Sequence, residues 1–153
     1  MATIYADSSD GYVTRWNQST WIAARDESAG TANSGQPAHY TGIAAEKVAA
    51  RSGGYVYNIF RSFLFFDTSA ILRPLDSATL KIYGYSSTYG DVIVLKANQG
   101  ATLGNGDFNS IVGWDETTDG AGGGNNIGNV TNYSAQITTW TTGGYNNITL
   151  NPA

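Results

Sequence analysis

Few side chains in this chain are suited to nucleophilic or acid–base catalysis. The chain has 153 residues, no cysteine and one histidine, His39, which stands in the segment SGQPAHYTG without a Gly-x-Ser-x-Gly motif. A lone histidine in a loop is usually a surface residue. The sequence therefore does not indicate a catalytic triad or dyad.

Carboxylates are the next candidates for chemistry. Asp107, Asp115, Glu116 and Asp119 could supply the pair of acids that a glycosidase uses. The simpler interpretation is that Asp107 caps a helical turn and that the other three lie in a solvated loop. The oxygens of Asp107, Asp115 and Asp119 are also candidate calcium ligands, although no EF-hand pattern accompanies them. We expect no catalytic residue, and no cofactor other than a candidate calcium ion in this loop.

Aromatic residues give the strongest binding signal. The chain contains 4 tryptophans and 10 tyrosines, and such rings form flat surfaces on which sugars stack, with Asn, Gln and Asp as hydrogen-bond partners. Trp21 and Trp140 are better suited to the core. The candidates for carbohydrate binding stand next to turns: Trp16, Tyr85, Tyr89 and Trp114.

Composition points to a single all-β domain. Charged residues make up 13% of the chain, while glycine accounts for 19 residues, and Thr, Asn and Tyr are also abundant. A net charge of −4 argues against binding to a nucleic acid backbone. The N-terminal sequence has no basic head or apolar core of a signal peptide, and no window approaches a membrane span. We expect synthesis in a host cytoplasm without a signal peptide, and no membrane insertion.

About eight short strands are predicted, separated by loops at roughly ten-residue spacing, which favours a two-sheet antiparallel sandwich, specifically a jelly roll, over residues 1–153. The run FLFF after Arg61 predicts a strand buried on both faces. From Ala78 the period is two, with Ala78, Leu80, Ile82 and Gly84 on one face. The predicted strands cover residues 2–6, 12–13, 21–25, 44–50, 55–66, 78–85, 91–96 and 146–150.

Two further segments predict short helical turns, over residues 107–114 and 131–140, each bringing aromatic residues over an end of the core. Residues 27–42 and 119–129 are rich in small and polar residues and predict loops. Asn58 is a candidate for a bulge in its strand.

The central stretch RSFLFFDTSAILRPLDSATLKIYGY resembles the Arg-x-(apolar run)-x-Asp-x-Ser…Ala-x-Leu-x-Leu core of DNRLRE-type, carbohydrate-binding-module-like jelly rolls. The segments ADSSDGYV, DFNSIVGW, YSAQITTW and GYNNITLN look like the version found in structural proteins of tailed phages. This resemblance implies a non-enzymatic β-sandwich on a surface and transfers no catalytic residue. Members of this kind continue with further strands after the ITLN segment, so we expect incomplete strand pairing at a C-terminal sheet edge, which invites strand addition.

The resemblance implies two uses that belong to different functional classes. The first is a phage virion surface protein, a capsid decoration or tail-fibre adhesin, which contacts other virion proteins or copies of itself and a host glycan. The alternative is a carbohydrate-binding module of a secreted enzyme. A glycosidase is a third and weaker interpretation. One fold serves all of these uses, so the fold does not choose among them.

Overall fold

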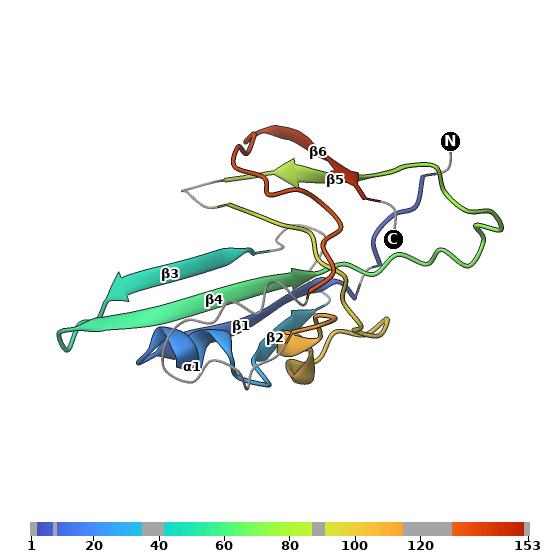
Figure 1. The fold of residues 1–153 in the computed structure, drawn as a ribbon. Helices are drawn as coiled ribbons and strands as arrows, with labels where there is room; N and C mark the ends of the chain where they lie inside the picture. Colours follow the sequence, from blue (N-terminus) through green and yellow to red (C-terminus); the bar gives the residue numbers. More distant parts are fainter. Residues whose placement is uncertain (1–2, 8, 35–41, 87–90, 115–129, 152–153) are drawn as a thin grey trace.

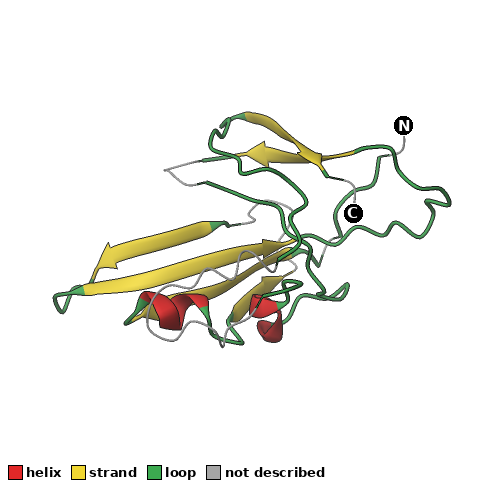
Figure 2. Cartoon of the chain, viewed as in Figure 1, coloured by secondary structure: helices red, strands yellow, loops and turns green. Residues whose placement is uncertain are grey.

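The computed structural model describes residues 3–7, 9–34, 42–86, 91–114 and 130–151, and it is mostly β (Figures 1 and 2). Its strands form two antiparallel sheets, which confirms the predicted all-β, two-sheet architecture. The elements, in chain order, are β1 (Gly11–Gln18), α1 (Trp21–Arg25), β2 (Thr31–Ser34), β3 (Ala44–Ala49), β4 (Tyr55–Phe63), β5 (Ala78–Gly84), the 3-10 turn η1 (Asn105–Asn109) and β6 (Gly144–Leu150).

The larger sheet has four strands in the order β2-β1-β4-β3. One of its faces carries Val13, Ile59 and Phe63, which pack against Ala24 of α1 and Phe108 of η1 in the main buried cluster. In Figure 1, α1 and η1 lie below this sheet and the two-stranded sheet lies above it. The main core of the chain therefore forms between the four-stranded sheet and the two short helical elements.

A β-bulge interrupts β1 where it passes Asn58 of β4. The register shifts between Arg15 and Gln18, and Asn17 adopts a left-handed backbone with φ of 56°. Its backbone N–H donates to Oδ1 of Asn58 over 2.8 Å, and Asn58 is 1% exposed. The bulge predicted at Asn58 in β4 is therefore wrong, because the bulge lies in the neighbouring strand β1. Asn58 lies opposite it and supplies the acceptor that the bulged backbone requires.

The smaller sheet pairs β5 with β6 in antiparallel register from Ala78 and Leu150 to Gly84 and Gly144. The predicted alternation of β5 is confirmed, because Leu80 and Ile82 are half-buried while Thr79, Lys81 and Tyr83 are exposed. Ile148 of β6 is 5% exposed and anchors the inner face.

Extended segments continue from this small sheet without forming long strands. Residues 91–97 and 130–137 meet in isolated bridges, Val92 with Ile137 and Leu95 with Asn132. The buried Ser134 accepts the backbone N–H of Val94 at its hydroxyl over 3.1 Å. The helical turn predicted over residues 131–140 is therefore wrong, because this segment lies extended against residues 92–95. The strand predicted over residues 91–96 is extended and makes only isolated bridges.

Three other predictions differ from the structure near the N-terminus. Residues 21–25 are helical rather than extended, since the Oγ1 of Thr20 accepts the N–H of Ala23 over 3.1 Å and caps α1. The loop predicted over residues 27–42 contains β2. Residues 3–6 form no strand, although the N–H of Asp7 donates to the carbonyl of Phe65.

Strand β4 ends three residues before the predicted limit at residue 66. The backbone N–H of Phe65 donates to Oδ1 of Asp10 over 2.8 Å, so a side chain replaces the next ladder bond. Of the predicted buried run, Phe63 is buried and the next three residues are half-buried.

In the part of the chain that the structure describes, no third named strand joins β5 and β6. Beyond the end of β6, the N–H of Asn151 donates to the carbonyl of Tyr133 over 2.7 Å. Residues 87–90 and 115–129 lie outside the described part of the chain, so the incomplete pairing predicted at this C-terminal sheet edge stays a prediction. The addition of a strand from a partner also stays a prediction.

Candidate functional site

Three tyrosines gather on the outward side of the two-stranded sheet. Tyr83 and Tyr145 lie directly opposite each other in the register, with ring centroids 5.3 Å apart and planes at 83°. Tyr85 follows the end of β5, two residues after Tyr83. The exposed fractions of Tyr83, Tyr145 and Tyr85 are 54%, 66% and 72%. We call this surface the tyrosine face, comprising Tyr83, Tyr85 and Tyr145 with their exposed strand neighbours Thr79, Lys81, Asn147 and Thr149.

The inner side of the same strands fixes the position of these rings. Asn146, next to Tyr145, donates through Nδ2 to the carbonyl of Thr141 over 2.9 Å, and its Oδ1 accepts the N–H of Thr141 over 2.8 Å. Gly84 lies so close to the Thr141 carbonyl that a Cβ would overlap that oxygen. Because these contacts with Thr141 fix the backbone of both strands on the inner side, the tyrosine side chains on the opposite side project from a defined backbone.

Polar groups surround the rings along the strands. Lys81 lies opposite Asn147 and Thr79 lies opposite Thr149, so each cross-strand pair contributes hydrogen-bonding groups. Apolar rings flanked by ammonium, amide and hydroxyl groups are the chemistry that recognises sugars, whose faces are apolar and whose edges carry hydroxyls. The tyrosine face is therefore suited to carbohydrate binding.

The structure describes three of the four predicted carbohydrate-binding residues and places them apart. Tyr85 belongs to the tyrosine face, and Tyr89 lies outside the described residues. Trp16 lies on β1 of the four-stranded sheet, where it is 51% exposed and meets Phe60 edge-on with ring centroids 5.3 Å apart. Trp114 is half-buried against Arg61. Trp16, Tyr85 and Trp114 therefore do not form one common platform.

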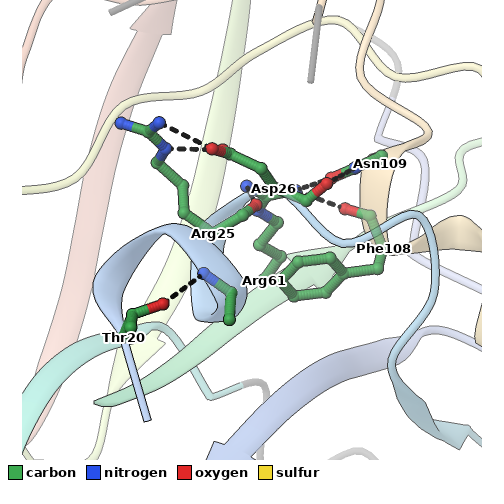
Figure 3. Close-up of polar contacts among 7 residues, drawn as sticks. Thr20, Arg25, Asp26, Arg61, Phe108 and Asn109 are labelled. Carbon is green, nitrogen blue, oxygen red and sulfur yellow. Dashed lines mark hydrogen bonds and ion pairs between the residues drawn. The ribbon is translucent and has the colours of Figure 1, made fainter. Parts of the chain in front are cut away.

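Arg61 lies against Trp114, and Figure 3 shows its contacts with Phe108, Asn109 and Arg25. Its guanidinium lies 4.2 Å from the ring centroid of Phe108 and 4.3 Å from that of Trp114. It donates to the carbonyls of Phe108 and Arg25 over 2.7 and 2.9 Å, and to Oδ1 of Asn109. This arrangement joins β4 to α1 and η1, so Arg61 stabilises the contact among these three elements.

Charge near Arg61 comes from one neighbouring ion pair. Arg25 contacts Asp26 in a bidentate pair, with Nε to Oδ1 at 2.6 Å and Nη2 to Oδ2 at 2.7 Å (Figure 3). Burial lowers the pKa of Arg61 to about 10, and the nearby Asp26 carboxylate opposes this decrease. Arg61 therefore keeps its charge at neutral pH.

The candidate calcium loop is described only at Asp107. Its Oδ2 accepts the N–H of Gly104 over 2.7 Å, and its Oδ1 accepts the hydroxyl of Ser110 over 2.9 Å. Both oxygens thus stabilise η1, in which Gly104 is the N-cap and Asp107 is the third residue. The turn begins at Asn105, two residues before the predicted start, so Asp107 helps to cap it from inside rather than from the predicted first position. Asp115, Glu116 and Asp119 lie outside the described residues, as does His39. Within the described segments, no three His, Cys, Asp or Glu side chains gather as metal ligands would.

Tyr83 and Tyr145 were not among the predicted site residues. The sequence does contain a signal for Tyr83, because its period-two alternation with Tyr85 puts both on the polar side of β5. Tyr145 gives no such signal alone, since it joins this surface only through the pairing of β5 with β6.

Comparison of the chain with models of known protein families, with curated proteins and with solved structures gives no significant match. Among the residues described here, no helix has the length and apolar character needed to cross a bilayer.

Proposed function

We propose that this chain is a non-enzymatic binding module that recognises glycans through the tyrosine face. The observation that carries this proposal is the perpendicular Tyr83–Tyr145 pair, two rings that stay more than half exposed on a surface flanked by polar side chains. Large exposed aromatic side chains that cluster on one face are typical of interaction sites. The cluster here combines apolar rings with hydrogen-bonding groups, which suits a sugar better than a wholly apolar partner.

The biological setting that we propose is the surface of a phage virion, as a decoration or tail-fibre module. This part of the proposal rests on the resemblance of the segments ADSSDGYV, DFNSIVGW, YSAQITTW and GYNNITLN to structural proteins of tailed phages. A module of a secreted glycan-degrading enzyme would use the same surface. Mass spectrometry of purified particles separates the two, because a virion protein copurifies with particles through a density gradient and an enzyme module does not.

A glycan array tests the binding function. We expect the wild-type chain to bind a subset of glycans and the double variant Tyr83→Ala/Tyr145→Ala to lose roughly thirtyfold in affinity, since each stacked ring contributes on the order of 1 kcal/mol. Both side chains are exposed, so circular dichroism should show an intact fold.

Tyr55→Ala is the matched control. Tyr55 is 58% exposed on β4 of the other sheet, and its removal should leave glycan binding unchanged. An array without any bound glycan, or equal losses in the Tyr55 and Tyr83/Tyr145 variants, would contradict the proposal.

A further inference from the structure

We infer that the tyrosine face selects acidic glycans, those whose sugars carry a carboxylate, and that Lys81 is the specificity-determining residue. This inference rests on the proposed function and adds the charge of the ligand to it.

Lys81 lies next to the rings on the same side of the sheet. It precedes Tyr83 by two residues on β5. Its cross-strand partner Asn147 follows Tyr145 by two residues on β6, so both lie on the same face as the rings. Same-face neighbours along a strand are roughly 7 Å apart. A sugar ring stacked on Tyr83 therefore puts its substituents within reach of the long, flexible lysine side chain.

The ammonium group of Lys81 is the charged group that the strands of this face present. The outward positions of β5 and β6 hold Thr79, Lys81, Tyr83, Tyr145, Asn147 and Thr149, and none of these is acidic. The two ion pairs among the described residues are Arg15 with Glu27 and Arg25 with Asp26, and neither involves Lys81. Lys81 is exposed, and the structure shows no carboxylate partner for it in the described segments.

The negative net charge of the chain contrasts with the positive charge of Lys81 on the tyrosine face. With a net charge of −4, the protein as a whole repels anions, while the tyrosine face presents a cation. An acidic sugar can gain a charge-assisted hydrogen bond from Lys81 at the same time as it stacks on Tyr83. Neutral sugars can gain only the stacking and the neutral hydrogen bonds.

The test compares a glycan with and without its charge. Oligogalacturonides and their methyl esters have the same rings and differ in the carboxylate, and an array with other uronic and sialic acids beside neutral sugars extends the comparison. We expect wild-type binding to be confined to carboxylated glycans and to weaken between 50 and 500 mM salt, as an interaction of exposed charges does (about 10 Å screening length at 0.1 M).

Substitutions at Lys81 assign the effect to this residue. Lys81→Gln should reduce affinity for acidic glycans roughly tenfold, and Lys81→Arg should restore most of it. Lys47→Gln on β3 changes the net charge equally but lies on the four-stranded sheet, so it should bind like the wild type.

The outcomes separate the inference from the proposed function. Binding of neutral glycans that is lost in Tyr83→Ala/Tyr145→Ala and unchanged in Lys81→Gln would overturn the acidic selectivity and leave the tyrosine face as a glycan site. An array without any bound glycan would overturn both. An equal loss in Lys81→Gln and Lys47→Gln would assign the effect to net charge and overturn the role of Lys81.

Discussion

At the scale of single residues, Asp10 combines a structural role with a partly buried charge. Its Oδ1 accepts the N–H of Phe65 over 2.8 Å, whereas its Oδ2 is buried without a hydrogen-bond partner. Burial raises the pKa of Asp10 above its ordinary value, the nearby Asp7 charge adds to this increase, and the bond from Phe65 opposes it. Asp10 therefore ends the hydrogen-bonded ladder between β1 and β4. Its partly buried side chain is less stable charged than it would be in water.

This increase in pKa predicts a pH dependence of folding. A carboxyl group with a raised folded-state pKa binds its proton more tightly in the folded than in the unfolded chain, so its contribution to stability decreases as pH rises through and above 3.8. The variant Asp10→Asn has no charge to bury. We expect the stability of Asp10→Asn relative to the wild type to increase between pH 3 and pH 7, as measured by urea unfolding.

Asp67→Asn is the control for this experiment, with the opposite sign. Hydrogen bonds from Ser69 lower the pKa of the exposed Asp67, so its substitution should lose stability relative to the wild type as pH rises through the same range. A difference between Asp10→Asn and the wild type that stays constant with pH would contradict the assignment for Asp10.

Single-residue roles were predictable from the sequence only where both partners are neighbours in the chain. The bond from the N–H of Ser69 to Oδ1 of Asp67, over 2.9 Å, follows from a short acidic side chain at the start of a turn. The contacts of Arg61 were not predictable in this way. Its acceptors, the carbonyls of Arg25 and Phe108, come from segments far along the chain and have no signature in side-chain type.

At the scale of elements, Arg61 is the side chain that connects three of them. It extends from β4 to the last residue of α1 and to the end of η1, so its loss should weaken the attachment of both helical elements. We expect Arg61→Met to lower the free energy of unfolding by about 3 kcal/mol, because three acceptors would lose their donor while the apolar stem remains. Urea unfolding with an unchanged m-value measures this loss.

Two variants sharpen the interpretation. Arg61→Lys should recover little of the stability, because an ammonium group cannot present the planar fork that stacks between Phe108 and Trp114. Arg51→Met, in the exposed turn between β3 and β4, should match the wild type. Surface substitutions usually change the free energy of unfolding by no more than about 0.5 kcal/mol. A change as small as this for Arg61→Met would contradict the connecting role.

An element could be predicted when its hydrophobic pattern was long and regular enough to fit one kind of secondary structure. The alternation of β5 predicted its two faces correctly, because a period of two that continues over seven residues indicates a strand. Residues 21–25 are too short to distinguish the two periods, and their helix depends on the hydroxyl of Thr20. The segment over residues 131–140 has helix-like spacing of its apolar residues, but its backbone hydrogen bonds join it to residues 92–96 instead.

At the scale of the whole molecule, the candidate site could be predicted in part. The sequence identified tyrosines near the end of β5 as exposed aromatic residues, which the structure confirms for Tyr85. The contact of Tyr145 with Tyr83 could not be predicted, because it depends on two strands that the whole segment from Gly84 to Gly144 separates in the sequence. Glycan binding and the virion setting stay predictions.

The four-stranded sheet leaves β3 at its edge with almost all of its residues exposed. Glu46 and Lys47 stand in the middle of this strand, and charged side chains on an edge strand disfavour pairing with another molecule. Glu46 is also bonded by Nδ2 of the buried Asn58, at 3.3 Å, so its charge is held in place. These charges therefore protect the β3 edge against pairing with a second copy of the chain.

The pairing of strands far apart in sequence has a consequence for how the chain reaches its structure. β1 pairs with β4, from Gly11 and Phe63 onward, and β5 pairs with β6, whereas the β3–β4 hairpin is closed by the short turn around Gly53 and Gly54. Chains dominated by such non-local contacts fold in roughly milliseconds to seconds. We expect stopped-flow tryptophan fluorescence to show refolding on this timescale, with the β3–β4 hairpin as the local structure available early. Refolding within microseconds would contradict this expectation.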